Sequence, residues 1–247
     1  SGMFRDAHGD FLAQAERYRP AIQGLFHAMP NGNLQDEPGG FDLLEFGANA
    51  RVPVIADPDS MLTAGAEFRA RNFEFDSQVR GGIEDETLYE LGAVFGYSRF
   101  FTEDTKVDFE FRPGLYTDFD GGAHGDDFKF FGKILGTFRY CDDLYFKLGI
   151  RHNEDFDDAP VLPMAGLAWI IDPCWRVDVL LPKRAEVTWL PDAATLLSLG
   201  LEVGGNEYHV RSTAGFGKRR FDVRTQEVDL YLGWTQRFDD NLSFLAR

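Results

Sequence analysis

The chain has 247 residues, of which 44% are hydrophobic, and its 41 acidic and 25 basic residues give a net charge of −16. No run of about 18 apolar residues is present, which excludes a transmembrane helix, and the acidic balance argues against a nucleic-acid-binding protein. The length suits one large all-β domain as well as two small domains.

Residues 1–42 differ in pattern from the rest of the chain. Apolar residues recur at helical spacing from Phe4 to Tyr18, and Pro20 interrupts them. A second short helix is expected over 21–29, and the stretch 31–40, rich in Gly, Asn, Asp and Pro, reads as a linker. We interpret 1–42 as a leader, partly helical or loosely ordered, with a plug or a periplasmic arm as the alternative. The opening Ser-Gly-Met resembles a cloning remnant, which is compatible with removal of a natural leader.

From Leu43 onward the hydrophobic period changes to two. In 61–71, for example, apolar residues at even positions alternate with Thr, Gly, Glu and Arg at odd positions, which places each set on one face of a β-strand. The same period recurs in the segments 45–54, 89–98, 107–115, 130–139, 144–151, 175–181, 197–203 and 227–237. Two segments depart from it, since 161–171 is apolar on both faces and 186–190 is short.

Short turns and longer connections alternate along this region. Turn signals occur at 57–59, 103–104, 141–143, 172–173, 191–192 and 239–240, and longer connections at 76–86, 119–127, 154–160 and 211–224. This arrangement is typical of an up-and-down antiparallel β-barrel, although the short link at 182–185 falls where a long one is expected. We predict a β-barrel domain of about 12 strands over 43–247.

The alternation alone leaves open which face is inside. A soluble β-barrel or sandwich that binds a ligand or protein partner alternates too, and it buries its apolar face. Three features favour the outer-membrane, porin-like type, whose transmembrane strands turn their apolar face to lipid: a Gly-, Ser- and Thr-rich polar face, an apolar face almost without charge, and aromatic residues near strand ends. These aromatic residues are Phe73, Phe75, Phe100, Phe101, Tyr116, Tyr140, Trp169, Trp175, Trp189, Trp234 and Phe238.

In an outer-membrane barrel the polar face lines the lumen. The lumen-facing charged residues are then Glu45, Arg51, Glu67, Arg69, Arg71, Glu90, Asp108, Glu110, Arg112, Lys133, Arg139, Lys147, Arg151, Arg176, Asp178, Glu202, Glu227, Asp229 and Arg237. Acids and bases are nearly balanced in this set, so we expect a lattice of ion pairs. The lattice either fills the interior of a plugged structural barrel or lines a channel for small polar solutes, and a site for one specific ligand is a third alternative.

Four segments carry a family resemblance. They are RPGLYTDFD (112–120), VLPMAGLAW (161–169), LLP (180–182) and NEY (206–208). In this order they resemble an uncharacterised bacterial family of predicted outer-membrane β-barrel proteins, a domain of unknown function, over roughly 43–247. The resemblance implies a barrel in the bacterial outer membrane, in contact with membrane lipid, and it implies no activity. Other outer-membrane components are left open as partners. Many such barrels end in an aromatic residue, whereas this chain ends in Arg247.

Metal and cofactor sites find little support in the sequence. The five histidines have no paired spacing for zinc. Asp118, Asp120, Asp126 and Asp127 crowd one glycine-rich loop and are weak calcium candidates, but the EF-hand pattern fails there and we expect a solvated loop. We predict no metal and no cofactor.

An enzyme is not expected either. Some outer-membrane barrels modify lipids with a Ser–His pair, and Ser98, Ser198 and His152 would be the candidates here, but no GxSxG context surrounds either serine. Cys141 and Cys174 lie in turns about three strand spacings apart, or about 14 Å at 4.8 Å each. A disulfide needs Cα atoms within about 7 Å, so we predict two free thiols.

Overall fold

The computed structural model describes residues 21–33, 40–57, 59–75, 86–119, 125–153, 161–192, 194–212, 219–237 and 243–246, with side chains left out over 205–227, from 236 onward and at a few other positions. Within these ranges the fold is all-β, apart from the 3₁₀ helix η2 (Gly125–Asp127). The strands are β1 (Ala21–Asn33), β2 (Gly40–Ala56), β3 (Ser60–Phe75), β4 (Glu86–Thr102), β5 (Thr105–Thr117), β6 (Phe128–Cys141), β7 (Leu144–Asn153), β8 (Val161–Asp172), β9 (Trp175–Leu181), β10 (Arg184–Trp189), β11 (Thr195–Ser212), β12 (Arg219–Arg237) and β13 (Ser243–Ala246). No helix in the described ranges is long and apolar enough to cross a membrane.

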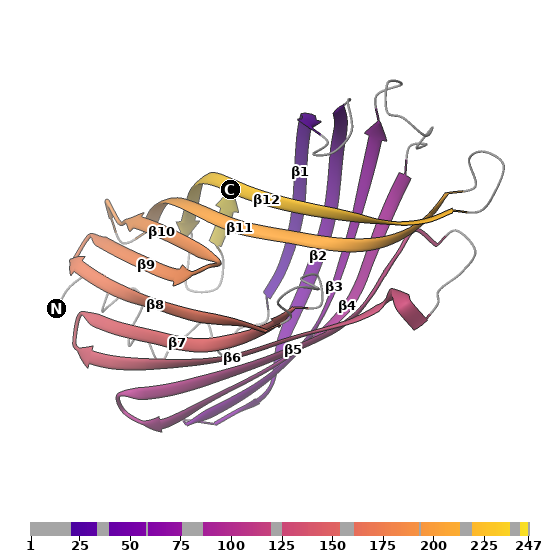
Figure 1. Ribbon diagram of the computed structural model, residues 1–247. Coiled ribbons are helices and arrows are strands. Elements are labelled where there is room, and N and C mark those ends of the chain that lie inside the picture. Colours follow the sequence, from indigo (N-terminus) through magenta and orange to yellow (C-terminus); the bar gives the residue numbers. More distant parts are fainter. Residues whose placement is uncertain are drawn as a thin grey trace.

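All thirteen strands belong to one sheet and follow one another in chain order, each antiparallel to the next. The prediction of an all-β, up-and-down antiparallel fold is therefore confirmed, with thirteen strands where about 12 were expected. The sheet curls strongly, and β11 returns to β5, where His209 and Thr117 form one parallel bridge (Figure 1). No pairing joins β1 to β13 in the described part of the chain, so closure into a barrel stays a prediction.

The sheet begins earlier than the sequence suggested. Residues 21–33 form β1, which pairs with β2 from Ala21 opposite Arg51 to Asn33 opposite Gly40. The helix expected over 21–29 is therefore wrong. Its apolar residues fit helical spacing and strand alternation equally well, and the open edge of β2 decides between them by offering backbone hydrogen bonds. The partly helical segment expected before residue 21 lies outside the described residues.

The short turns are stabilised by aspartate side chains. Asp172 Oδ1 accepts hydrogen bonds from the backbone N–H groups of Cys174 (2.7 Å) and Trp175 (2.9 Å). Asp192 Oδ1 accepts from Ala194 and Thr195, both at 2.8 Å. The Ala194 N–H in particular lowers the pKa of Asp192, since it stabilises the carboxylate. Aspartate at these positions therefore closes the turns that the sequence placed there.

The two faces of the sheet differ in kind. We call the face enclosed by the curl the inner face and the opposite one the outer face. Most exposed side chains of the outer face are apolar, among them Phe46, Phe68, Phe95, Phe109, Phe130, Leu148, Leu199 and Leu230. Buried side chains of the inner face include the charged residues Glu45, Arg71, Glu90, Lys147 and Asp178. This is the reverse of a soluble β-protein, which buries its apolar face and exposes its charges.

Aromatic side chains gather on the outer face at the end of the sheet with the short turns. Phe101, Tyr140, Trp169, Trp175, Trp189 and Trp234 are all exposed there. Trp175 and Trp189 occupy paired positions on β9 and β10 and stack with centroids 5.8 Å apart. Phe238, expected in the same group, lies outside the described residues.

The predicted grouping of Phe73, Phe75, Phe100 and Tyr116 with these exposed aromatics is wrong. Phe100 packs against the buried Tyr145 and Ala168. Phe73 and Tyr116 are buried on the inner face, in a cluster that we call the inner aromatic cluster, because they share the alternation phase of Arg71 and Gly114. Its members are Leu43, Phe73, Leu88, Tyr116 and Phe131, with Met29, Phe41 and Phe75 packed against them. The cluster lies at the opposite end of the sheet, where the longer connections join the strands.

A second inner cluster explains the strand that is apolar on both faces. Met164 of β8 packs with Leu135 of β6 and Leu180 of β9. β8 therefore buries apolar side chains inside while Trp169 and Ile171 are exposed outside.

Glycines on the inner face allow neighbouring strands to approach closely. A Cβ at Gly166 would lie 2.9 Å from Leu180 Cα and closer still to the Val179 carbonyl oxygen, whereas at Gly132, on the outer face, its nearest neighbours would be 3.9 Å away. We expect Gly166→Ala to lower the free energy of unfolding by about 1–3 kcal/mol, because the backbone must shift. Gly132→Ala is the control and should change stability little. Urea unfolding of both variants measures the difference, and equal stabilities would contradict this packing.

Candidate functional site: the charged inner face

Charged side chains on the inner face form three groups of ion pairs. The first, the Glu45 group, joins β2, β3 and β4 beside the inner aromatic cluster. Arg71 Nε lies 3.0 Å from Glu45 Oε2 and 3.9 Å from Glu90 Oε1, and Arg69 Nε lies 3.2 Å from Glu45 Oε1. The Arg71 side chain is 2% exposed, so these carboxylates, and not water, stabilise its positive charge.

The second group is centred on Glu110 of β5. Its carboxylate lies 2.9 Å from Arg112 Nε, 3.5 Å from Lys133 Nζ and 3.8 Å from Arg51 NH2. Arg112 also reaches Glu67 at 3.7 Å. Arg51 belongs to β2, which does not pair with β5, so the contact between Arg51 and Glu110 crosses the concave face of the sheet. We call these five residues the Glu110 group.

The third group is centred on Asp178 of β9, and we call it the Asp178 group. Lys147 Nζ donates to both carboxylate oxygens, at 2.9 and 2.7 Å, and Arg176 NH2 donates to Oδ2 at 2.8 Å. Arg184 of β10 lies 3.6 Å away. Three cations thus share one carboxylate that is only 4% exposed.

Smaller contacts lie toward the short-turn end of the inner face. Lys106 Nζ lies 3.0 Å from Asp108 Oδ2, and Ser98 Oγ donates to Asp108 Oδ1 at 2.6 Å. Arg139 pairs with the exposed Asp104 at 2.6 Å. Farther along, Tyr231 of β12 extends across Gly200 of β11, and its hydroxyl donates to Glu186 Oε2 of β10 at 2.6 Å.

The structure brings most of the predicted charged residues into these groups. Glu202 lies 3.7 Å from Lys183, and Arg151 is half-buried and faces the same side as Lys147. Asp229, in register with Glu202, is exposed. The side chains of Glu227 and Arg237 are outside the described part. Their shared role in lining a lumen remains a prediction.

Sequence reasoning missed several inner charged residues. Lys106 shares the phase of Asp108, and Arg184 and Glu186 share one phase on the short β10, so alternation carried through to the strand ends would have found them. Lys183 lies in the turn between β9 and β10, where no strand period applies. Its position follows only from the fold.

The structure does not bring together the candidates for a Ser–His catalytic pair. Ser98 and Ser198 lie on the inner face, whereas His152 follows Leu148 and Ile150 on the outer face of β7. In the aspartate-rich loop, Asp127 is buried and Asp118 half-buried, while Asp120 and the side chain of Asp126 are not among those described. Within the described ranges, no three His, Cys, Asp or Glu side chains form a group that could hold a metal ion.

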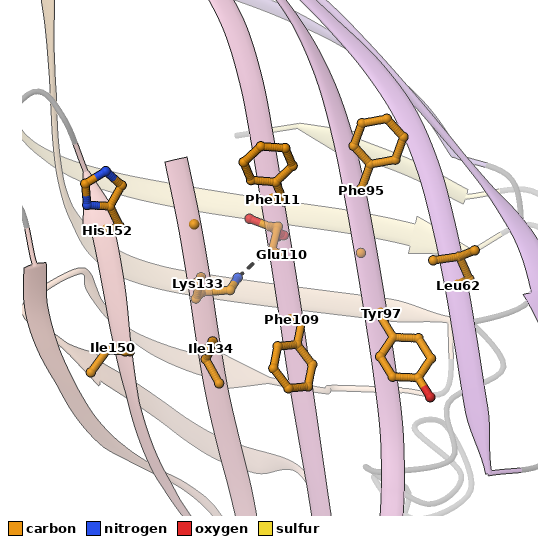
Figure 2. A pocket seen from close by; sticks show the side chains of 12 residues that line it. Leu62, Phe95, Tyr97, Phe109, Glu110, Phe111, Lys133, Ile134, Ile150 and His152 are labelled. Atoms are coloured by element: carbon orange, nitrogen blue, oxygen red, sulfur yellow. Dashed lines mark ion pairs between the residues drawn. The ribbon is translucent and has the colours of Figure 1, made fainter. Parts of the chain in front are cut away.

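A shallow hollow of about 370 Å³ lies on the outer face across β3 to β7. Figure 2 shows Phe95, Phe109, Phe111, Ile134 and Ile150 around it, with His152 at one side and the Glu110–Lys133 ion pair behind. Gly132 contributes no side chain between Phe111 and His152, its partners on the two flanking strands. The hollow is therefore an apolar depression in an apolar face.

Both cysteines are free thiols, as predicted, with Cys141 exposed and Cys174 half-buried. We expect both to react with a thiol reagent without prior reduction, and Cys141 to react faster in the folded protein. Labelling of the Cys141→Ser and Cys174→Ser variants in detergent assigns the two rates. A single disulfide per chain would contradict the geometry.

Comparison with known proteins gives no relative. No family model, curated protein or solved structure matches the chain.

Proposed function

We propose that the chain forms an outer-membrane β-barrel whose outer face contacts lipid and whose charged inner face lines a lumen for small polar solutes. The distribution of burial carries this proposal. Apolar side chains at alternate positions of most strands are exposed, whereas charges at the intervening positions are buried or paired. In water this arrangement would leave a large apolar surface exposed, and in a bilayer it is the stable one.

Two further features support contact with lipid. The exposed aromatic side chains at the short-turn end suit the membrane–water boundary, where amphipathic rings are favoured. The apolar hollow over Gly132 has the chemistry of a surface that accommodates an acyl chain.

A water-filled lumen is favoured over a plugged one by the accessibility of the inner charges. Arg51, Arg112, Lys183 and Arg184 keep between 36% and 42% of their side-chain surface accessible. In a plugged interior these side chains would be covered, as Arg71 is. We therefore favour a channel over a purely structural barrel.

Size-exclusion chromatography with and without detergent tests the membrane assignment. We expect the purified chain to be monodisperse only in detergent and to insert into phosphatidylcholine vesicles. A compact monomer in plain buffer would overturn the proposal in favour of a soluble β-barrel or sandwich. Single-channel recording in a planar bilayer then tests for a channel, and incorporated protein that passes no current would leave a structural barrel.

A further inference from the structure

Among the described side chains, the middle of the inner face has an excess of positive charge, although the chain as a whole is acidic. Around Glu110, the described side chains provide five cations (Arg51, Arg112, Lys133, Arg151 and Lys183) and three carboxylates (Glu67, Glu110 and Glu202). We call these eight residues the central cluster. Adding the Asp178 group, Glu186 and Asp229 gives eight cations against six carboxylates among the described side chains.

Lys183 extends this cluster from another part of the curled sheet. The hairpin of β9 and β10 is short, since Leu181 pairs with Ala165 in the middle of β8 and Arg184 pairs with Glu202 in the middle of β11. Its turn therefore lies partway along the sheet and not at its edge. Hydrogen bonds from Lys183 N–H to the Leu180 carbonyl (2.9 Å) and from Val203 N–H to the Lys183 carbonyl (2.7 Å) hold the turn in place.

The electrostatic surroundings of Lys183 are positive on balance. The groups that face it are Arg112 and Glu110 of β5, Lys133 of β6, Arg151 of β7 and Glu202 of β11. The Lys183 side chain is 37% accessible, and its carboxylate contact is with Glu202, at 3.7 Å. Glu202 alone does not offset the neighbouring cations.

We propose that the central cluster is a binding site for small oxyanions such as carboxylates, phosphate and sulfate, which makes the channel selective for anions. This inference rests on the proposed function and specifies its solute. Guanidinium and ammonium groups are the donors that recognise carboxylate and phosphate oxygens, through short charge-assisted hydrogen bonds. Because Arg51, Arg112 and Lys183 are accessible to water, a solute can reach them. A concave region with an excess of positive charge also concentrates anions electrostatically.

Reversal potentials across a phosphatidylcholine bilayer with a tenfold KCl gradient test the selectivity. We expect the wild-type channel to prefer chloride, and Lys183→Gln or Arg151→Gln to reduce the chloride-to-potassium permeability ratio by about threefold or more. Lys106→Gln removes the same charge near the short-turn end and should change the ratio less. A cation-selective wild-type channel, or equal ratios in all variants, would overturn the inference and leave the channel intact.

A charge-conserving variant adds a second readout. Lys183→Arg keeps the positive charge and should keep the chloride preference of the wild type, whereas Lys183→Gln should not, which separates a role for the charge from misfolding. Equal losses of chloride preference in Lys183→Arg and Lys183→Gln would contradict the assignment.

Binding measurements separate this inference from the channel itself. If no current is observed, isothermal titration with sodium sulfate in detergent applies, since sulfate remains a dianion from pH 7 to pH 9. Binding that is weakened in Lys183→Gln and Arg151→Gln but not in Lys106→Gln would support an anion site in a closed barrel. Absence of sulfate binding would overturn it.

Discussion

Replacing Asp178 with asparagine is expected to lower the free energy of unfolding by about 3–5 kcal/mol, the range seen when one partner of a buried ion pair is removed. The side chain keeps its size, so packing is preserved, but Lys147, Arg176 and Arg184 lose their shared negative charge. Lys147 is expected to lose the most electrostatic stabilisation, because its ammonium group is buried and donates hydrogen bonds to both carboxylate oxygens. Urea unfolding of the protein in vesicles, followed by tryptophan fluorescence, measures the change.

The matched control is Asp104→Asn. Asp104 also accepts from a cation, Arg139, but its side chain is 61% exposed, so its removal should cost at most about 1 kcal/mol. A double-mutant cycle with Lys147→Met identifies the cause of the larger loss. If the loss arises because Lys147 is left buried without a carboxylate, Lys147→Met should lower the free energy of unfolding less in the Asp178→Asn protein than in the wild type. Equal losses for Asp178→Asn and Asp104→Asn would mean that the Asp178 group is solvated.

The strand alternation was readable in the sequence because side chains on opposite faces of this sheet meet such different surroundings. β3 is the clearest case, with Ala66 and Phe68 exposed on one side and Thr63 and Arg71 buried on the other. β1 was missed because its apolar residues satisfy two periods at once. β13 was missed because four residues carry no period, and only the pairing of Trp234 with Ala246 and its neighbours defines it.

The phase of the inner face was also predictable, but its change of chemistry along the strands was overlooked. Leu43 and Glu45 share a phase, as do Phe73 and Arg71, so β2 and β3 pass from charged to apolar side chains toward the longer connections. The prediction that Phe73 is an exposed aromatic residue was inconsistent with this phase, because Phe73 lies on the same face as Arg71. The same consideration would have placed the inner aromatic cluster next to the Glu45 group.

The ion-pair partners could not have been predicted from the sequence. Arg51 meets Glu110 because the curvature of the sheet brings β2 toward β5. Lys183 faces Arg151 because a hairpin of two short strands ends partway along its neighbours. Both contacts depend on curvature and register, which no local pattern encodes. Together they determine where the positive charge of the inner face is concentrated.

The sharpest test of the orientation of the sheet is an arginine on its outer face. Leu148 lies in the middle of β7 and is 59% exposed, flanked on the same face by the exposed Phe146 and Ile150. In a lipid-facing strand, Leu148→Arg should lower the free energy of unfolding in vesicles by about 2–4 kcal/mol, because the charge enters the hydrocarbon. In a water-facing strand the same exposed position would tolerate arginine.

Tyr140→Arg provides the control. Tyr140 is 76% exposed on the outer face of β6, next to the short turn that begins after Cys141. At the membrane boundary an arginine should cost no more than about 1 kcal/mol, because it can reach water and phosphate groups. A large loss of unfolding free energy for Leu148→Arg, together with a small loss for Tyr140→Arg, is therefore the result expected of a bilayer, where the cost of a charge depends on its depth. If both variants unfold like the wild type, the outer face does not contact lipid, and the proposed outer-membrane barrel is wrong.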